Sequence, residues 1–129
     1  MHEKEIEIRW RDLDAYGHVN HAVFATYLEE VRDEWLELAL GRDGDLWDYV
    51  VARVAIDYRR ELTLEDDSVR ARCGLDSLGT SSVRTREAVV VGDGQVAAEA
   101  EAVLVARDPE TRRPRPLTES ERSRLEAAA

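Results

Sequence analysis

Residues 20–40 of the chain read NHAVFATYLEEVRDEWLELAL. Apolar side chains recur every three or four residues along this stretch, which is the spacing of one face of an α-helix. Asn20 is a typical N-cap, because its side-chain oxygen can accept a hydrogen bond from a free amide of the first turn, and Gly41 is a typical terminator. The stretch predicts a helix of about 30 Å from Asn20 to Leu40. The predicted apolar stripe comprises Phe24, Tyr27, Leu28, Val31, Trp35 and Leu38.

Alternating apolar and polar residues predict β-strands on both sides of this helix. The first predicted strand covers about residues 4–11, where Ile6, Ile8 and Trp10 alternate with charged residues. Hairpin signals separate the later strands, and consecutive strands joined in this way favour an antiparallel meander. A capping box formed by Thr118 and Glu121 predicts a short closing helix. The four later strands are predicted at about residues 50–62, 69–75, 82–91 and 95–107.

The order of these elements predicts an α+β fold in which a sheet lays its apolar face over the long helix. A length of 129 residues fits a single domain spanning residues 1–129. The other face of the sheet is expected to be polar, so apolar residues there indicate that the protein forms oligomers. These residues are Val51, Ala55, Val90, Ala97, Val103 and Val105.

Composition excludes several classes of protein. With 18 basic and 28 acidic residues, a net charge of −10 repels a nucleic-acid backbone. The lone Cys73 excludes an intrachain disulfide, and we expect it to be a buried strand residue. The sequence has no leading apolar stretch with a cleavage site and no long apolar run, so a soluble cytoplasmic protein without membrane contact is expected.

Polar residues that can carry chemistry gather in the link between the first strand and the helix. Asp12, Asp14, Gly17, His18 and His21 all lie in or beside this link. Free amides at a helix start can polarise a carbonyl oxygen, and a nearby carboxylate can attack that carbonyl or activate a water molecule. The combination is typical of an acyl-transfer site.

The same residues carry a resemblance to a known family. The run Asp-x-Asp-x-x-Gly-His-Val-Asn, the sequence YLEEVR at residues 27–32, LGTSS at residues 78–82 and VARDPETRRPRPL near the end resemble the hotdog-fold acyl-CoA thioesterases of the 4-hydroxybenzoyl-CoA thioesterase type. The resemblance covers nearly the whole chain. It implies a curved antiparallel five-stranded sheet wrapped around one long helix, two protomers joined edge to edge, and a thioester bound at the subunit interface.

The resemblance also implies roles for individual residues. Asp14 matches the catalytic carboxylate, which acts as a nucleophile or as a general base. His21 matches a position where the helix-start amide, and in some members the side chain, meets the thioester carbonyl. Glu29 matches an acidic position near the site. The predicted substrate-binding residues are Gly17, His18, Asn20, Arg59, Thr80, Ser81, Ser82 and Arg84.

Coenzyme A carries several phosphate charges, and some members hold them with basic residues where this chain has Gly79, Thr80 and Ser81. A chain of net charge −10 needs a local basic patch for such a ligand. Most of its Arg residues are expected to be solvated residues paired with carboxylates. The candidates for phosphate ligands are Arg59, Arg84, Arg112, Arg113 and Arg115.

Each candidate also has a purely structural interpretation. Asp14 can form an Asx turn leading into the helix, and Asp12 is expected to have a turn or strand-end role. Asn20 is expected to be a cap rather than a substrate contact, His21 can be an ordinary first-turn residue, and Glu29 can lie on a solvated face. Asp12, Asp14, His18 and His21 also resemble metal ligands, but the sequence lacks a helix-borne His pair or a Cys partner beside them, and no metal is predicted.

The sequence therefore predicts a thioester hydrolase that acts on acyl-CoA or another acyl thioester, without metal or organic cofactor, and with coenzyme A as part of the substrate. A homodimer at least, and a homotetramer by preference, is expected. Two alternatives remain open because one scaffold hosts many activities. These are a non-catalytic acyl-CoA sensor or binding protein, and a hotdog hydratase or dehydratase.

Overall fold

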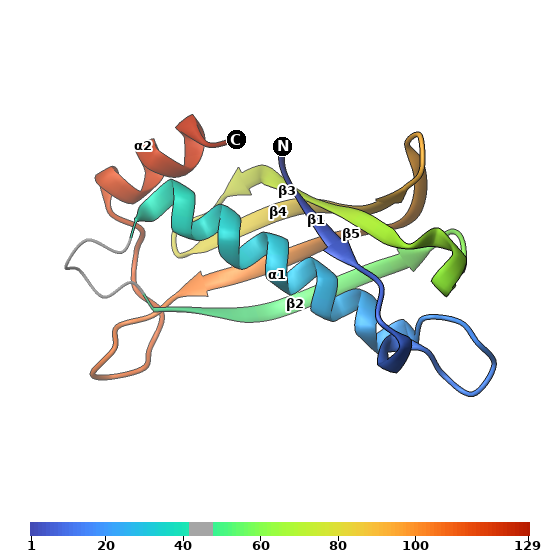
Figure 1. Ribbon diagram of the computed structural model, residues 1–129. Coiled ribbons are helices and arrows are strands. Elements are labelled where there is room, and N and C mark those ends of the chain that lie inside the picture. Colours follow the sequence, from blue (N-terminus) through green and yellow to red (C-terminus); the bar gives the residue numbers. More distant parts are fainter. Residues whose placement is uncertain (42–47) are drawn as a thin grey trace.

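The long helix α1 (His21–Leu40) crosses one face of the sheet in the computed structural model, which describes residues 1–41 and 48–129 (Figure 1). Its N-cap is Asn20, whose side-chain oxygen accepts a hydrogen bond from Ala22 N. Its last turn ends at Gly41, whose backbone φ of 72° is in the region that favours glycine. Both predicted ends of the helix are confirmed.

The five strands form one antiparallel sheet with the order β1-β3-β4-β5-β2. Strands β3, β4 and β5 form a meander, as the hairpin signals predicted. The expectation that β2 continues this meander is wrong, because β2 pairs with β5 and occupies the far edge. Turn signals report only connections between neighbours in sequence, and the pairing of β2 joins residues about 50 positions apart. The bounds are β1 (His2–Glu7), β2 (Tyr49–Tyr58), β3 (Ser68–Leu78), β4 (Ser82–Val91) and β5 (Gln95–Ala106).

The apolar stripe of α1 packs on the inner face of the sheet and forms the core. One member of the predicted stripe is wrong, because Leu38 is 68% exposed. Leu36 and Leu40 are buried in its place. Toward its end the helix therefore buries a face slightly rotated from the one that its first turns bury. Cys73 is fully buried on β3, as predicted.

The first strand is shorter than predicted. It ends at Glu7, and a 3-10 turn, η1 (Trp10–Asp12), follows it. Trp10 is 80% exposed, so its predicted place on the buried face of a strand is wrong. The alternation of residue types continues through Ile8 to Trp10, although the chain has already left the sheet, so alternation alone did not mark the end of the strand.

The outer face of the sheet is more polar than predicted. Ala97 is fully buried in the core beside a β-bulge between Val89 and Val90, so its predicted place on the outer face is wrong. Val90 is also fully buried, but it pairs with Arg70 and lies outside the core that packs on α1. A bulge adds one residue to a strand and reverses which side chains point outward beyond it. The outer face carries ion pairs instead, such as the pair between Arg86 and Asp76 with an N–O distance of 2.7 Å.

A buried ion pair joins the middle of α1 to the sheet. Arg32 donates two hydrogen bonds of 2.8 Å to the carboxylate of Glu87 on β4. The hydroxyl of Thr85 donates to the same carboxylate at 2.6 Å, and the thiol of Cys73 lies 3.8 Å from it. Arg32 and Glu87 are 3% and 2% exposed. Burial alone lowers the pKa of Arg32, but the bonds to Glu87 outweigh it and raise this pKa.

The C-terminal segment closes the end of the core where α1 finishes. The short helix α2 (Glu119–Ala127) begins with the predicted capping box of Thr118 and Glu121. Its Leu125 is fully buried against the second half of α1. Neither helix in the described residues combines the length and the apolar character needed to cross a lipid bilayer.

Candidate active site

The loop of residues 13–19 joins η1 to α1 and is closed by its own backbone bonds. Leu13 and Val19 form an antiparallel bridge. Inside it, Asp14 N donates to His18 O at 2.7 Å, and Gly17 N donates to Asp14 O at 3.2 Å. Gly17 has a φ of +83°, which L side chains rarely adopt. The loop is therefore a tight turn that carries Asp14 and leads into the N-cap of α1.

The carboxylate of Asp14 is half-buried and shaped by this turn. Its Oδ1 accepts hydrogen bonds from Tyr16 N at 2.9 Å and from His18 N at 3.3 Å. This is the Asx turn that the sequence allowed. No hydrogen bond within residues 1–41 and 48–129 uses Oδ2. One oxygen therefore orients the carboxylate, and the other is open for chemistry.

The helix start offers an open backbone donor in the N–H of His21. Asn20 accepts from Ala22 N through its side chain at 2.9 Å and from Val23 N through its carbonyl at 2.8 Å, so it is a cap, as expected. Within the described part of the chain, the N–H of His21 donates to no acceptor. The helix dipole adds partial positive charge at this end. The His21 amide can therefore polarise a carbonyl oxygen or stabilise an oxyanion.

Tyr58, at the end of β2, is a site residue that the sequence did not single out. Its hydroxyl donates to His21 O at 3.0 Å, and its ring is 47% exposed. The ring centroid lies 5.1 Å from that of Phe24 and 6.4 Å from that of His21. Tyr58 thus places an aromatic wall beside the helix start. Its position in a regular strand gave no signal, since the alternation assigned it simply to an apolar face.

His18 turns away from the open donor toward the link after β2. Its Nε2 lies 3.0 Å from a carboxylate oxygen of Glu61, and both side chains are well exposed. Asp12 turns inward to the hydroxyl of Tyr27. No three His, Cys, Asp or Glu side chains in the described ranges gather as the ligands of a metal ion would.

The structure brings only some of the predicted residues together. Gly17, His18, Asn20 and His21 lie with Asp14 at the start of α1 (Figure 1). Residues 79–82 lie at the other end of the sheet, where Ala106 N donates to Ser81 O and Leu117 N donates to Thr80 O. Thr80, Ser81 and Ser82, which were predicted to bind substrate, are therefore far from Asp14 within one protomer.

The charged candidates are also dispersed. Glu29 is exposed on α1, two turns beyond the helix start. Arg59 forms an exposed ion pair with Glu99 at 3.3 Å, and Arg84 forms one with Glu101 at 3.2 Å. Both guanidinium groups thus already have a carboxylate partner.

Comparison with known proteins bears on what this arrangement does. Residues 8–125 match the family model described as the thioesterase-like superfamily. The chain belongs to this superfamily. With its α1 wrapped by an antiparallel sheet, this thioesterase has the hotdog fold, and it is a thioester hydrolase.

Individual relatives match this thioesterase over almost their whole length. The long-chain acyl-CoA thioesterase FadM of Escherichia coli (strain K12) is 31% identical over 131 residues, which is 96% of each chain. A thioesterase from Thermus thermophilus, solved in complex with coenzyme A and Zn, is 36% identical with a TM-score of 0.87, covering 98% of this chain and 92% of its own. The probable thioesterase YbaW of Escherichia coli is 28% identical with a TM-score of 0.83, covering 98% and 97%.

Proposed function

We propose that the protein hydrolyses acyl-CoA thioesters, with Asp14 as the acting carboxylate and the His21 N–H as the donor to the thioester carbonyl. The observation that carries this proposal is the junction between the 13–19 loop and α1. There a tight turn carries a carboxylate oxygen without a partner in the described chain, and the helix that follows this turn begins with an amide that is equally open. The similarity to FadM and to the coenzyme A complex of the Thermus thermophilus enzyme supports the choice of substrate.

Two routes satisfy this arrangement. In the first, Asp14 attacks the carbonyl carbon, the C–S bond breaks to release the thiolate, and water then hydrolyses the acyl-aspartyl anhydride. In the second, Asp14 takes a proton from a water molecule that attacks the same carbon, and the thiolate leaves with a proton. In both routes the His21 N–H stabilises the negative oxygen. Neither route needs a cofactor, and coenzyme A takes part only as the leaving group.

We further propose that two copies pair through β2. This strand forms a ten-residue edge, and its Val51, Val54 and Tyr58 side chains are 49%, 39% and 47% exposed. A long apolar edge strand with unpaired backbone groups is a template for a further strand. The opposite edge, β1, has only six residues, most of them charged or His. An isologous dimer through β2 covers the edge and its apolar side chains.

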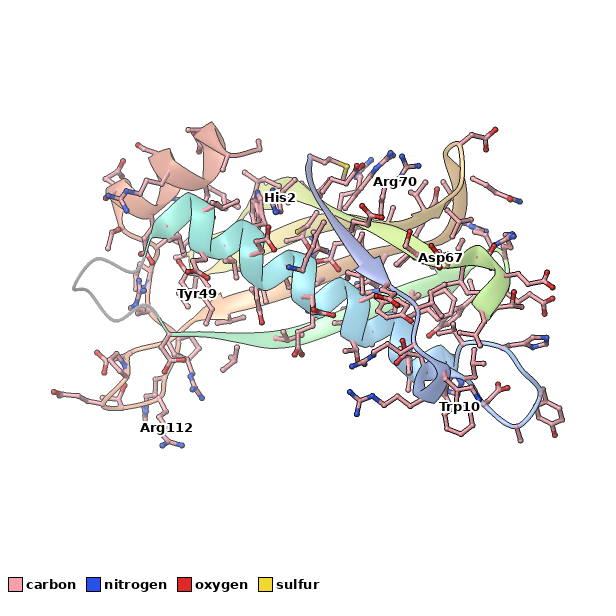
Figure 2. All side chains as sticks on the ribbon, in the orientation of Figure 1. His2, Trp10, Tyr49, Asp67, Arg70 and Arg112 are labelled. Atoms are coloured by element: carbon pink, nitrogen blue, oxygen red, sulfur yellow. The ribbon has the colours of Figure 1, made fainter. Side chains whose placement is uncertain are left out.

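Antiparallel pairing of two β2 strands has a consequence for the site. It sets the Tyr49 end of one strand beside the Tyr58 end of the other. The Tyr58 end carries the candidate site. At the Tyr49 end, residues 107–114 leave β5 as a closed loop, and Arg112 lies there, far from Trp10 in the same protomer (Figure 2). The loop of one copy is thus directed toward the site of the other.

Arg112 and Arg113 are the best candidates for phosphate ligands. Neither guanidinium group has an ion pair or hydrogen bond within the described residues, whereas Arg115 is held by Glu121 at 2.8 and 2.9 Å. Asp108 fixes the backbone of the loop by accepting from Glu110 N at 2.8 Å and Thr111 N at 3.0 Å. We propose that this pair binds coenzyme A phosphates for the site of the second copy.

A direct assay tests the function. We expect the purified protein to release free coenzyme A, detected with a thiol reagent, from one or more members of a panel of acyl-CoA thioesters that varies in chain length and aromatic character. Tight binding of these thioesters without thiol release contradicts hydrolysis and identifies a sensor. Hydration of an enoyl-CoA without thiol release contradicts it in favour of a hydratase. The expected cytoplasmic location remains a prediction.

Mixed dimers test the shared site. We expect Asp14→Asn to be inactive and the double variant Arg112→Ala/Arg113→Ala to raise KM about tenfold or more, because each lost charge-assisted bond is worth about 1.5–3 kcal/mol. Co-expression of the two variants restores complete sites in about a quarter of positions, since half of the dimers are mixed and each mixed dimer has one intact site. Activity equal to the sum of the two separate variants, or a monomer in sedimentation, contradicts the proposal.

A further inference from the structure

Asp12 is a buried carboxylate directly before the 13–19 loop, and it is 2% exposed. Its Oδ2 accepts from the hydroxyl of Tyr27 at 2.7 Å and from Arg9 N at 3.0 Å, and its Oδ1 accepts from the Arg9 guanidinium at 3.1 Å. Burial alone raises the pKa of Asp12, but these three bonds outweigh it and lower the pKa. Burial and Asp12 raise the pKa of Tyr27, so its hydroxyl remains a donor.

The backbone of Asp12 holds the far end of the same loop. Its carbonyl oxygen accepts from Asn20 N at 2.9 Å, and Asn20 is the N-cap of α1. Its side chain reaches Tyr27, in the second turn of that helix. A single residue therefore ties the beginning of the loop to the helix at two points, one on either side of the His21 amide.

Few other contacts in the described chain hold the loop. Ala15, Tyr16 and Gly17 at its tip are exposed. At its base, Val19 N donates to Leu62 O at 2.7 Å, His18 meets Glu61 in an exposed contact of 3.0 Å, and Leu13 and Val19 pack against the core. The position of the Asp14 carboxylate relative to the helix start thus depends on the bonds at the base of the loop, and Asp12 makes most of those that lead to α1.

We propose that Asp12 is a positioning residue for hydrolysis, which fixes the separation between the Asp14 carboxylate and the His21 N–H. The inference rests on the proposed function, because it concerns two groups that must address one carbonyl carbon together. Acyl transfer requires precise alignment of the carboxylate and the N–H on the carbonyl group, and a displacement of about 1 Å can lower the rate about 100-fold. Asp12 itself is buried, and its carboxylate is occupied by Arg9 and Tyr27.

The chain offers a matched control at the 3-10 turn η2 (Leu64–Asp66). Asp66 has the same place in its turn as Asp12 has in η1, and it accepts from Thr63 N and from the Arg60 guanidinium, both at 2.9 Å. It accepts no hydroxyl from α1 among the bonds of the described chain. Loss of Asp66 therefore removes a similar local motif without releasing the Asp14 loop.

Kinetics of three variants test the proposal. We expect Asp12→Asn to lower kcat about 10- to 100-fold with KM changed less than about threefold, because binding groups are intact and only alignment is lost. Tyr27→Phe lowers kcat in the same direction by less, and the double variant is no worse than Asp12→Asn, since both act through one bond. Asp66→Asn retains kcat within about twofold. Equal losses in Asp12→Asn and Asp66→Asn, or additive losses in the double variant, overturn the inference.

Amide hydrogen exchange gives a readout that does not depend on turnover. In both Asp12→Asn and Tyr27→Phe we expect faster exchange in residues 13–19, with unchanged rates in β4 and β5. Unchanged exchange in the loop overturns the role of Asp12. If the native protein releases no thiol from any thioester, the proposed function fails, and the exchange experiment still decides whether Asp12 holds the loop. Should Asp12→Asn fail to fold, Tyr27→Phe carries both measurements.

Discussion

Asp14→Asn is expected to lower kcat by about three orders of magnitude with the fold intact, because a positioned acid–base or nucleophilic carboxylate contributes roughly 100- to 10,000-fold. The asparagine side chain keeps an oxygen that can accept from Tyr16 N and His18 N, so the turn is preserved. What it loses is the charge and the second oxygen, which is the atom that has no partner in the described chain. Steady-state hydrolysis of an acyl-CoA measures the loss.

The control for this variant is Asp76→Asn. Asp76 is an exposed carboxylate on the outer face of the sheet, paired with Arg86. It lies outside the loop and the helix start, so we expect its removal to leave kcat unchanged. Near-normal turnover in Asp14→Asn would falsify the assignment of the acting carboxylate. An equal loss in both variants indicates a general effect on folding instead.

A single turnover in heavy-oxygen water separates the two routes to the same product. If Asp14 is the nucleophile and water opens the anhydride at the aspartyl carbon, label enters the Asp14 carboxylate, which mass spectrometry of the loop peptide detects. If Asp14 is a general base, the label appears only in the released acid.

Local signals made the helix and the link before its start predictable. The spacing of apolar residues fixed the length of α1, and the Asn20 cap and Gly41 terminator were both confirmed. The 11–20 link was identified because polar residues gather before a helix start, and the structure places them there. These features depend on interactions between residues at most a few positions apart, which a sequence pattern records directly.

Long-range pairing was not predictable in the same way. The placement of β2 beside β5, the bulge at Ala97, and the bond from Tyr58 to the helix start all depend on which strands meet. The outward turn of Trp10 depends on where β1 leaves the sheet. Sequence alternation gives two faces to a strand but does not say which neighbour it has.

The buried ion pair between Arg32 and Glu87 is the clearest example of a long-range contact that was not predicted. The two residues are 55 positions apart, and their pairing was not predicted. On β4, alternation does put Glu87 on the inner face, in step with Val83, Thr85 and Val89, and all four are buried. A charged residue on an apolar face indicates a buried partner, because an unpaired charge there is too costly. Arg32 lies within the buried stripe of α1 and is that partner.

Glu87→Gln is expected to lower the free energy of unfolding by about 3–5 kcal/mol, because it leaves the Arg32 guanidinium buried without a counter-charge. This is a large part of the roughly 5–15 kcal/mol that stabilises a typical domain. Urea unfolding at neutral pH, followed by circular dichroism, measures the loss. The outer-face variant Asp76→Asn provides the comparison: it breaks an ion pair with a single N–O contact of 2.7 Å, in which the Arg86 side chain is 74% exposed, and we expect it to cost less than about 1 kcal/mol.

The double variant Arg32→Met/Glu87→Leu separates the cost of an unpaired charge from the worth of the pair. Apolar side chains of similar size need no counter-charge, and replacing a whole buried pair in this way is often neutral or stabilising. We therefore expect the double variant to recover most of the stability that Glu87→Gln loses, although Thr85 then lacks the acceptor for its 2.6 Å bond. A double variant as unstable as the single one contradicts this account and shows that the pair itself holds α1 on the sheet. If Glu87→Gln lowers the free energy of unfolding by less than about 1 kcal/mol, the account is also contradicted, because a buried guanidinium without its carboxylate partner must destabilise the fold by more than that.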